Sequence, residues 1–385
     1  MIRTLSFKAA ATALALCLSA PAAMAQEGLA PEFSSFARST HSGGPSVDYQ
    51  IWTDLLRDIV YDVGLSDREP PVGRPILTGT RINTGNTSRY RYEGNRVVYH
   101  LMSEEYRNAI TEYRRDLETL PERVDLARLS SDEQLAYWIN LHNVAVIEQL
   151  MNEYPVTRVN RVQINGEPLY EAKILNVAGV PLSLNDIRLR IVYEQWNDPL
   201  VIYGFFNGAV GSPNILRNAY TGANVWTSLS NNAREFINSL RGIEIDRDEL
   251  EVSVIYNDAR PYFFPNWNAD LRSHLSGYAI DSAYDQLRGN LPIDADVEAW
   301  EIADLINGSG RCTGGAGDIT VQSYSREGGN VSSGVCGAIP QTAQALIRDV
   351  EIRRLELIRN GTYGRVYVRD IPTDDPDTEE DESQR

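Results

Sequence analysis

Histidine and cysteine are both scarce, with four histidines and three cysteines in 385 residues. No group of them has the spacing of a zinc site, so we predict no metal and no other cofactor. The glycine-rich stretch at 308–317 lacks the Gly-Lys-Ser/Thr ending of a phosphate-binding loop, and no Gly-x-Ser-x-Gly elbow occurs. These absences exclude the common nucleotide-binding and serine-hydrolase signatures.

A surplus of positive charge is also missing. The chain has 53 acidic and 36 basic residues and a net charge of −17. Because phosphate recognition needs a basic surface, we predict no nucleic-acid partner. Within the predicted tail, 363–385, the segment 370–385 holds eight acids against one arginine, which predicts a solvated, disordered C-terminus.

Long apolar runs are confined to the N-terminus. Arg3 and Lys8 precede the apolar residues 9–18, and Ala23-Met24-Ala25 supplies small residues on either side of a methionine. This pattern predicts a secretory signal cleaved near Ala25 and therefore a periplasmic or secreted bacterial protein. No other stretch approaches the ~20 apolar residues of a membrane-spanning helix, so no span is predicted.

Cleavage would leave two cysteines, Cys312 and Cys336, in a stretch dense in glycine and serine. In an oxidising compartment such a pair is expected to form a disulfide. In the chain-entropy model, closing a loop of about 25 residues stabilises the fold by roughly 3 kcal/mol. We therefore expect a disulfide-stapled helical appendage at 291–362, with a long helix at 341–359.

The main domain is predicted over 47–290, after a flexible leader at 26–46. Apolar spacing indicates helices at 51–63, 100–120, 131–154 and 225–240. The clearest is the third, where Ser130 and Glu133 have capping-box spacing and Pro155 ends the pattern. On its expected buried stripe lies His142, with Asn140 and Asn143 beside it.

Strand signals fall between these helices. They predict a strand at 158–164, a hairpin near 174–184, a strand at 199–206 buried on both faces, and a strand at 251–256. Ser183 and Asp186 again have capping spacing, so Asp186 is interpreted as a helix-start residue. The expected fold class is α+β, with a small mixed sheet packed against several helices.

Several segments taken in order resemble the domain-of-unknown-function 547 (DUF547) family over residues 47–279. They include "AYWINLHNVAVIEQL", "LSLNDIRLRI", "LVIYGFFNGAVGSPNI" and "AYTGANVWTSLSNNAREFINS". The family helix commonly reads Trp-Ile-Asn-x-Tyr-Asn, and here His142 replaces the second aromatic. The resemblance implies a fold remotely similar to papain-like cysteine hydrolases.

The chain departs from that family where chemistry would reside. Many members carry Asn-Cys and Cys-Pro steps where this chain has Asn207-Gly208 and Ser212-Pro213. Many also carry Ile-Glu-His, which is replaced here by Ile187-Arg188-Leu189. A serine at 212 needs a base even more than a thiol would, and Leu189 cannot supply one.

Three hypotheses follow. The first is an exported, catalytically degenerate binding module for a peptide, glycan or envelope protein, with Tyr203, Phe205 or Phe206 as apolar walls. Its candidate cleft residues are Asn140, Asn143, Asn185, Asp186 and Asn207. The second is a hydrolase or acyl-transferring enzyme with Ser212 as nucleophile and His142 as base. The third is a purely structural envelope protein.

Some of these residues also have structural interpretations. His142 can be a core histidine whose ring nitrogens are paired. Asn140 and Asn143 can hold the backbone of a neighbouring turn, for which 208–214 is the expected place.

Overall fold

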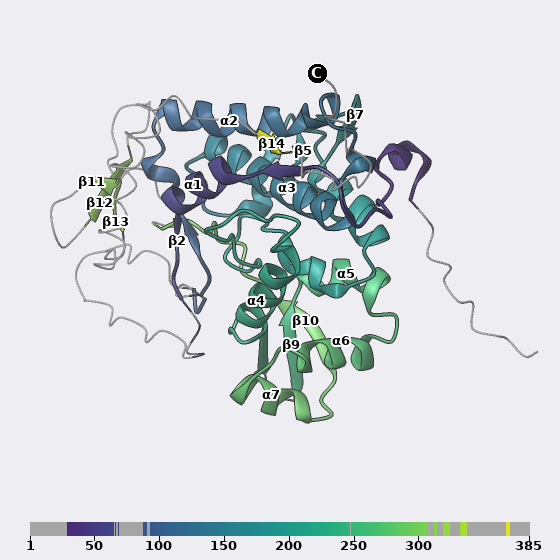
Figure 1. The fold of residues 1–385 in the computed structure, drawn as a ribbon. Helices are drawn as coiled ribbons and strands as arrows, with labels where there is room; N and C mark the ends of the chain where they lie inside the picture. Colours follow the sequence, from purple (N-terminus) through teal and green to yellow (C-terminus); the bar gives the residue numbers. More distant parts are fainter. Residues whose placement is uncertain are drawn as a thin grey trace, which may run out of the picture.

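Figure 1 shows the computed structural model of the chain. It describes residues 29–64, 66, 68, 88–90, 93–246, 248–305 and 308, and beyond them the backbone of short strands at 312–313, 319–323, 332–336 and 367–369. The predicted signal segment, most of the predicted C-terminal appendage and the rest of the acidic tail lie outside the described residues.

Three helices dominate one end of the molecule: α1 (Gln50–Ile59), α2 (Glu104–Glu118) and α3 (Ser131–Glu153). The predicted caps are confirmed, because the Ser130 hydroxyl accepts from the Glu133 amide as α3 begins. The Glu133 carboxylate does not return to Ser130. Its two oxygens accept the amides of Val47 and Gly222, which ties α3 to two distant segments.

Helix α3 is the centre of the core and is buried on nearly every side. It packs against α2, against β1 (Ser46–Asp48), against the π-helical segment η6 (Asp186–Tyr193), and against α4 (Val225–Ile237). The expectation of one buried stripe was therefore too narrow. A helix covered all round must pair its polar side chains internally, which explains the carboxamides described below.

The segment at 199–206 is not a strand. It forms the 3-10 helix η7 (Pro199–Gly204) and then an extended stretch. Asp198 caps it by accepting the Leu200 amide, and Pro199 fits the first turn. The strand prediction was wrong because a short apolar run buried on all sides has no periodicity that separates strand from helix.

Before η6 the chain forms the predicted hairpin, from β6 (Leu175–Val177) and β7 (Val180–Leu182). Ala178 and Gly179 have positive φ at its turn, as a tight hairpin requires. The Ser183 hydroxyl then accepts from the Asp186 amide while the Asp186 carboxylate accepts from the Ser183 amide. This reciprocal capping confirms Asp186 as a helix-start residue.

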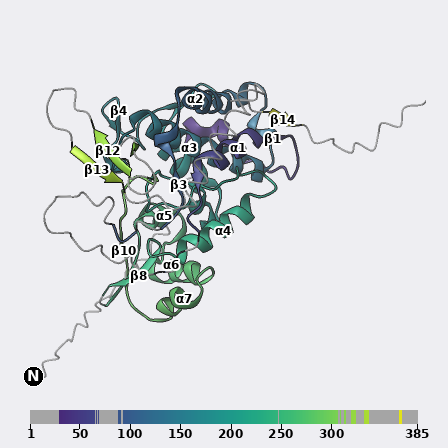
Figure 2. The same ribbon diagram turned by 90° about the vertical axis from the view of Figure 1, so that its left-hand side faces the viewer.

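The opposite end of the molecule holds a three-stranded sheet with helices on it (Figures 1 and 2). The strands are β8 (Ile243–Asp246), β9 (Glu249–Ser253) and β10 (Ile293–Val297), in the order β10-β9-β8. Strand β10 is parallel to β9, whereas β8 is antiparallel to it. The helices are α5 (Ile255–Phe263), α6 (Trp267–Ser276) and α7 (Asp281–Arg288). A mixed sheet among helices confirms the α+β class.

After β10 the chain returns to the helical end. Asp304 forms a parallel bridge with Val97, and Ile302 an antiparallel bridge with Ala209. The predicted domain boundary at residue 290 falls just before these pairings, so residues 293–304 continue the folded core.

The remaining strands are short. They pair as β1 with β14 (Tyr367–Arg369), β2 (Val60–Tyr61) with β3 (Arg96–Val97), and β4 (Gln163–Ile164) with β5 (Glu167–Pro168). Strand β14 lies inside the segment predicted as a disordered tail. In the glycine-rich stretch, β11 (Cys312–Thr313), β12 (Ile319–Ser323) and β13 (Ser332–Cys336) form an antiparallel sheet. The predicted Cys312–Cys336 disulfide and the helix at 341–359 concern side chains and residues outside the described part, so both stay predictions.

Candidate functional site

Ser212 is a buried turn residue. Its hydroxyl donates within a bifurcated contact to the carbonyl oxygens of Ala209 and Pro213, at 2.8 and 3.1 Å. Its amide also donates to Ala209 O at 3.1 Å. Among the described residues this hydroxyl has no imidazole partner. A nucleophile needs a base within hydrogen-bond reach, whereas this serine closes its own turn.

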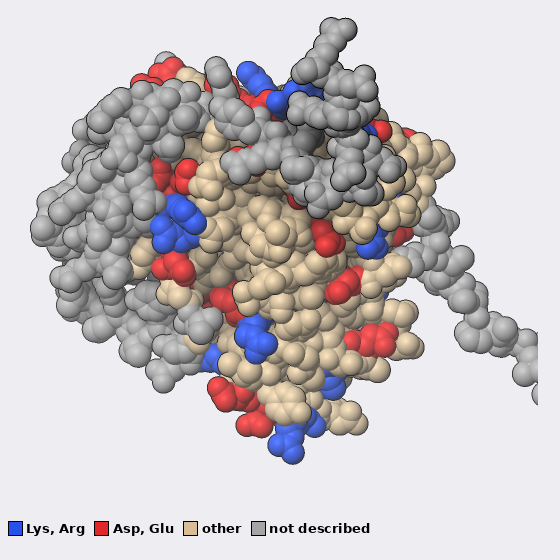
Figure 3. Space-filling view, in the orientation of Figure 1, with Lys and Arg blue, Asp and Glu red and all other residues tan. Residues whose placement is uncertain are grey.

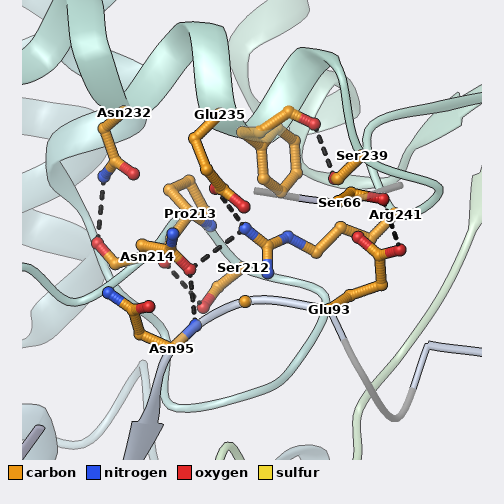
Figure 4. Close-up of polar contacts among 12 residues, drawn as sticks. Ser66, Glu93, Asn95, Ser212, Pro213, Asn214, Asn232, Glu235, Ser239 and Arg241 are labelled. Atoms are coloured by element: carbon orange, nitrogen blue, oxygen red, sulfur yellow. Dashed lines mark hydrogen bonds and ion pairs between the residues drawn. The ribbon is translucent and has the colours of Figure 1, made fainter. Parts of the chain in front are cut away.

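The turn is held from behind by a polar cluster that Figure 4 shows around Asn214. Asn214 Oδ1 accepts from the Asn95 amide and from Arg241 Nη2, at 2.8 and 3.1 Å. Asn232 Nδ2 donates to Asn214 O at 2.9 Å. Arg241 is 0% exposed and pairs through the same Nη2 with Glu235 at 2.5 Å. The cluster fixes the backbone that follows Ser212.

Gly208, where many family members are expected to carry cysteine, has no room for a side chain. Its φ is +86°, and a Cβ there would lie 2.2 Å from Leu150 Cδ1 on α3. Positive φ disfavours any residue with a side chain, and the contact with Leu150 would force the helix side chain to move. The Asn207-Gly208 step has thus become a tight backbone turn.

His142 is enclosed on α3. Its Nδ1 meets Asn143 Oδ1 at 3.1 Å, and its ring packs edge-on against Phe205 with centroids 4.9 Å apart. Burial lowers the pKa of His142 to about 3, since the charged imidazolium would lose its hydration. A ring that resists protonation is a poor general base, and the Ser212–His142 pair is not formed as a hydrogen bond among the described residues.

Asn140 and Asn143 both bind backbone. Asn140 donates to Tyr220 O and accepts from Tyr220 N, at 2.7 and 3.1 Å. Asn143 donates to Gly204 O and accepts from Phe206 N, at 2.9 and 3.1 Å. The structural interpretation is confirmed, but the expected partner turn at 208–214 was wrong. Each carboxamide therefore donates to one backbone carbonyl and accepts from one backbone amide of a segment that packs on α3.

The three proposed apolar walls, Tyr203, Phe205 and Phe206, are all buried. Tyr203 contacts Tyr256 OH and His274 Nε2 through its hydroxyl, at 3.0 and 2.9 Å. These residues belong to the core and line no surface, which corrects the sequence-based expectation.

The other candidates gather around η6. Asn185 donates to Glu171 Oε1 at 2.6 Å and accepts from Arg188 Nη2 at 2.9 Å. Asp186 accepts from Lys173 and from Arg190, the latter at 3.1 Å. These salt bridges and its capping bonds keep the pKa of Asp186 below its usual value although burial opposes the shift.

Asn207 lies between η7 and Gly208. Its side chain accepts the Ala209 amide at 2.9 Å, and its carbonyl accepts the Tyr170 hydroxyl at 2.6 Å. The Tyr170 carbonyl accepts the Asn185 amide at 3.0 Å, so Tyr170 links Asn207 to the start of η6, whereas Ser212 lies with the Asn214 cluster.

Arg188 was missed by sequence reasoning except as a departure from the family pattern. It lies in the π-helical turn, and its Nη2 reaches Asp258 Oδ2 on α5 at 2.7 Å. Short π-helical segments are frequent at functional sites. Two tyrosines, Tyr170 and Tyr193, lie near enough to the Arg188 guanidinium to affect its pKa electrostatically. In the sequence, the signal for Arg188 was that an arginine stands where the family pattern has a glutamate.

A second missed pair is His100 and Asp304. His100 Nδ1 lies 3.8 Å from Asp304 Oδ1, and both side chains are buried. Asp304 Oδ2 also accepts from Tyr154 OH and from the Gly308 amide, at 3.1 and 2.8 Å. The two residues are remote in sequence, so no local carboxylate pattern marked His100.

The described residues were also searched for a metal cluster and for a membrane-spanning helix. Within the described part of the chain, no cluster of three or more His, Cys, Asp or Glu side chains is placed to hold a metal ion. No helix in that part combines the length and apolar character needed to cross a membrane. On the face shown in Figure 3, acidic and basic side chains are interspersed around a broad uncharged area.

One comparison with known proteins matches the region that contains these candidate residues. Residues 126–237 match the family model described as "Protein of unknown function, DUF547". Neither the comparison with curated proteins nor that with solved structures finds a match. The matched residues run from the start of α3 through η6, the Gly208 turn and Ser212 to the end of α4. By this match residues 126–237 form a DUF547 family region within the chain.

Proposed function

We propose that this protein is an exported, catalytically degenerate DUF547 protein that binds a ligand in the cell envelope and does not hydrolyse it. The observation that carries the proposal is the bonding of Ser212, whose hydroxyl is buried and directed to two backbone carbonyls. A hydroxyl in this role has neither a base nor open access to substrate.

The other positions of the expected catalytic set support the same conclusion. Leu189 replaces the expected imidazole and packs against the core. Gly208 leaves no space for a thiol, and the His142 ring is enclosed by Phe205 and Asn143. In a papain-like ancestor these positions would have carried the reaction, and here each has a structural task.

Export and the binding partner belong to the proposal. The apolar run at 9–18 with Ala23 and Ala25 supports cleavage near Ala25 and a periplasmic or secreted location. The Cys312–Cys336 disulfide would suit that compartment. A peptide, a glycan or an envelope protein is the expected class of ligand.

The alternative is a hydrolase or acyl-transferring enzyme that uses Ser212 with His142. Labelling of the purified full-length protein with a fluorophosphonate, which modifies activated serines, separates the two. We expect no adduct at Ser212 by peptide mass spectrometry.

Ser239→Ala is the matched control, because Ser239 is also buried and also donates to a backbone carbonyl, Phe236 O, at 2.7 Å. An adduct that disappears in Ser212→Ala and persists in Ser239→Ala would establish the enzyme and end the proposed binding role.

A further inference from the structure

We propose that Arg188 anchors a site for a ligand carboxylate, and that Asp258 occupies the ligand's place when the site is empty. The inference rests on the proposed binding function and names the chemistry of the ligand. It concerns the side of the core where η6 meets α5, away from the turn of Ser212.

The first argument is the way in which Arg188 holds Asp258. Arg188 Nη2 donates to Asn185 Oδ1 at 2.9 Å and to Asp258 Oδ2 at 2.7 Å. The Arg188 side chain also hydrogen-bonds the Tyr193 side chain. A guanidinium binds a carboxylate best through two parallel N–H···O bonds, so the contact with Asp258 uses the group incompletely.

The second argument is the unequal exposure of the two partners. The Arg188 side chain is 17% exposed, whereas that of Asp258 is 50% exposed. Asp258 can therefore return to water at little cost, while Arg188 cannot leave its surroundings. The opposite arrangement occurs at Lys173 and Asp186, where the cation is 47% exposed and the carboxylate 4%. A largely buried arginine paired with a half-exposed aspartate is suited to exchange that carboxylate for the carboxylate of a ligand.

The third argument concerns what lies beside the guanidinium. Tyr193 packs edge-on against Tyr262 and Phe263, with centroids 5.5 and 5.2 Å apart. Tyr262 and Phe263 are only partly buried. Aromatic rings next to a cation provide apolar contact for the remainder of a ligand whose carboxylate pairs with the arginine.

The charge balance favours a carboxylate over a phosphate. Among the described residues, the charge that a ligand would displace from Arg188 is that of the Asp258 carboxylate. The neighbouring Arg190 is already paired with Asp186 and Glu32, at 3.1 and 2.5 Å. A single guanidinium matches a monoanion, whereas a phosphate dianion usually requires more cationic partners.

Titration of the full-length protein with three acetylated dipeptides tests the proposal by NMR or calorimetry. The probes are acetyl-Ala-Ala with a free terminal carboxylate, acetyl-Ala-Glu-amide with a side-chain carboxylate, and acetyl-Ala-Gln-amide with neither. We expect millimolar binding of at least one charged peptide and none of the uncharged one. The peptide that binds identifies the source of the carboxylate.

Variants make the test specific. Asp258→Asn should strengthen binding of the charged peptide roughly tenfold, because the competing carboxylate is gone. Arg188→Gln should abolish binding, and Arg188→Lys should weaken it because the fork is lost. The controls Arg190→Gln and Asp285→Asn should change the affinity by less than about twofold. Asp285 matches Asp258 in charge but is 74% exposed and lies on α7.

The proposal is overturned if neither charged peptide binds Asp258→Asn, if Asp258→Asn binds no more tightly than Asp285→Asn, or if inorganic phosphate binds better than both peptides. These outcomes are independent of the fluorophosphonate result. Labelling at Ser212 would remove the proposed function, whereas loss of peptide binding without labelling would remove only the ligand assignment.

Discussion

Two arginine–carboxylate pairs in this protein make the same contact in different surroundings. Arg241 pairs with Glu235, and Arg188 pairs with Asp258, and in each pair the arginine reaches the carboxylate through Nη2. Nε and Nη1 of Arg241 are buried without a hydrogen-bond partner in the described part of the chain. The backbone of Gly94 packs directly against this guanidinium, since a Cβ at Gly94 would lie 1.6 Å from Arg241 Nη1.

The difference between the pairs is access. The Arg241 pair is sealed beneath the turn of Ser212 (Figure 4), so its unused donors can meet no ligand. The Arg188 pair has an exposed partner that can move away. Breaking the first should therefore change stability, and breaking the second should change binding.

The largest effect is expected from Glu235→Gln. It removes the carboxylate that pairs with the buried Arg241 guanidinium, and removing one partner of a buried pair typically costs about 3–5 kcal/mol. Chemical denaturation of the purified protein measures the loss.

Asp285→Asn provides the comparison, because Asp285 lies 3.9 Å from Arg288 in an exposed pair and its removal should leave the unfolding midpoint unchanged. Equal midpoints for Glu235→Gln and Asp285→Asn would contradict the sealed character of the Arg241 pair.

A smaller effect is expected from pH through His142. In the unfolded chain this imidazole takes up a proton near its usual pKa, but in the folded protein burial lowers the pKa to about 3. Between these values the unfolded state binds more protons, so the free energy of unfolding falls as the pH is lowered. From about pH 7 to about pH 5 the expected loss is about 2 kcal/mol.

His142→Gln isolates this contribution, because glutamine cannot titrate. The difference between wild type and variant should shrink by that amount across the same pH range. A pH-independent difference would mean that His142 is accessible enough to ionise in the folded protein, which would reopen its role as a base.

The smallest effect on stability is expected at Arg188 itself. Its partner Asp258 is half exposed, and ion pairs open to solvent contribute about 0–1 kcal/mol. Arg188→Gln should therefore shift the denaturation midpoint far less than Glu235→Gln does. If the two variants are equally destabilised, Arg188 is a structural residue like Arg241.

Local features of the fold were predictable because neighbouring residues determine them. Ser130 caps α3, the Ala178-Gly179 turn forms the hairpin, and Ser183 with Asp186 begins the helix that contains η6. The segment at 199–206 was not predictable, since an apolar run gives no period once every side is buried.

The candidate site was predictable in composition but not in arrangement. Departure from the family pattern identified Gly208, Ser212 and Leu189 as positions where the expected thiol and imidazole are missing, although Ser212 remained a candidate nucleophile. It did not show that Asn143 bonds Gly204 and Phe206, or that Asp304 lies beside His100, because those contacts join residues far apart in the chain.

The sequence by itself determined which groups are present: a hydroxyl at 212 with no expected thiol or imidazole beside it, and an arginine at 188 where the family pattern has an acid. Only the tertiary structure decided which of these groups water can reach. Access depends on how distant segments pack, and burial determines whether a charge holds the fold together or remains available to a ligand.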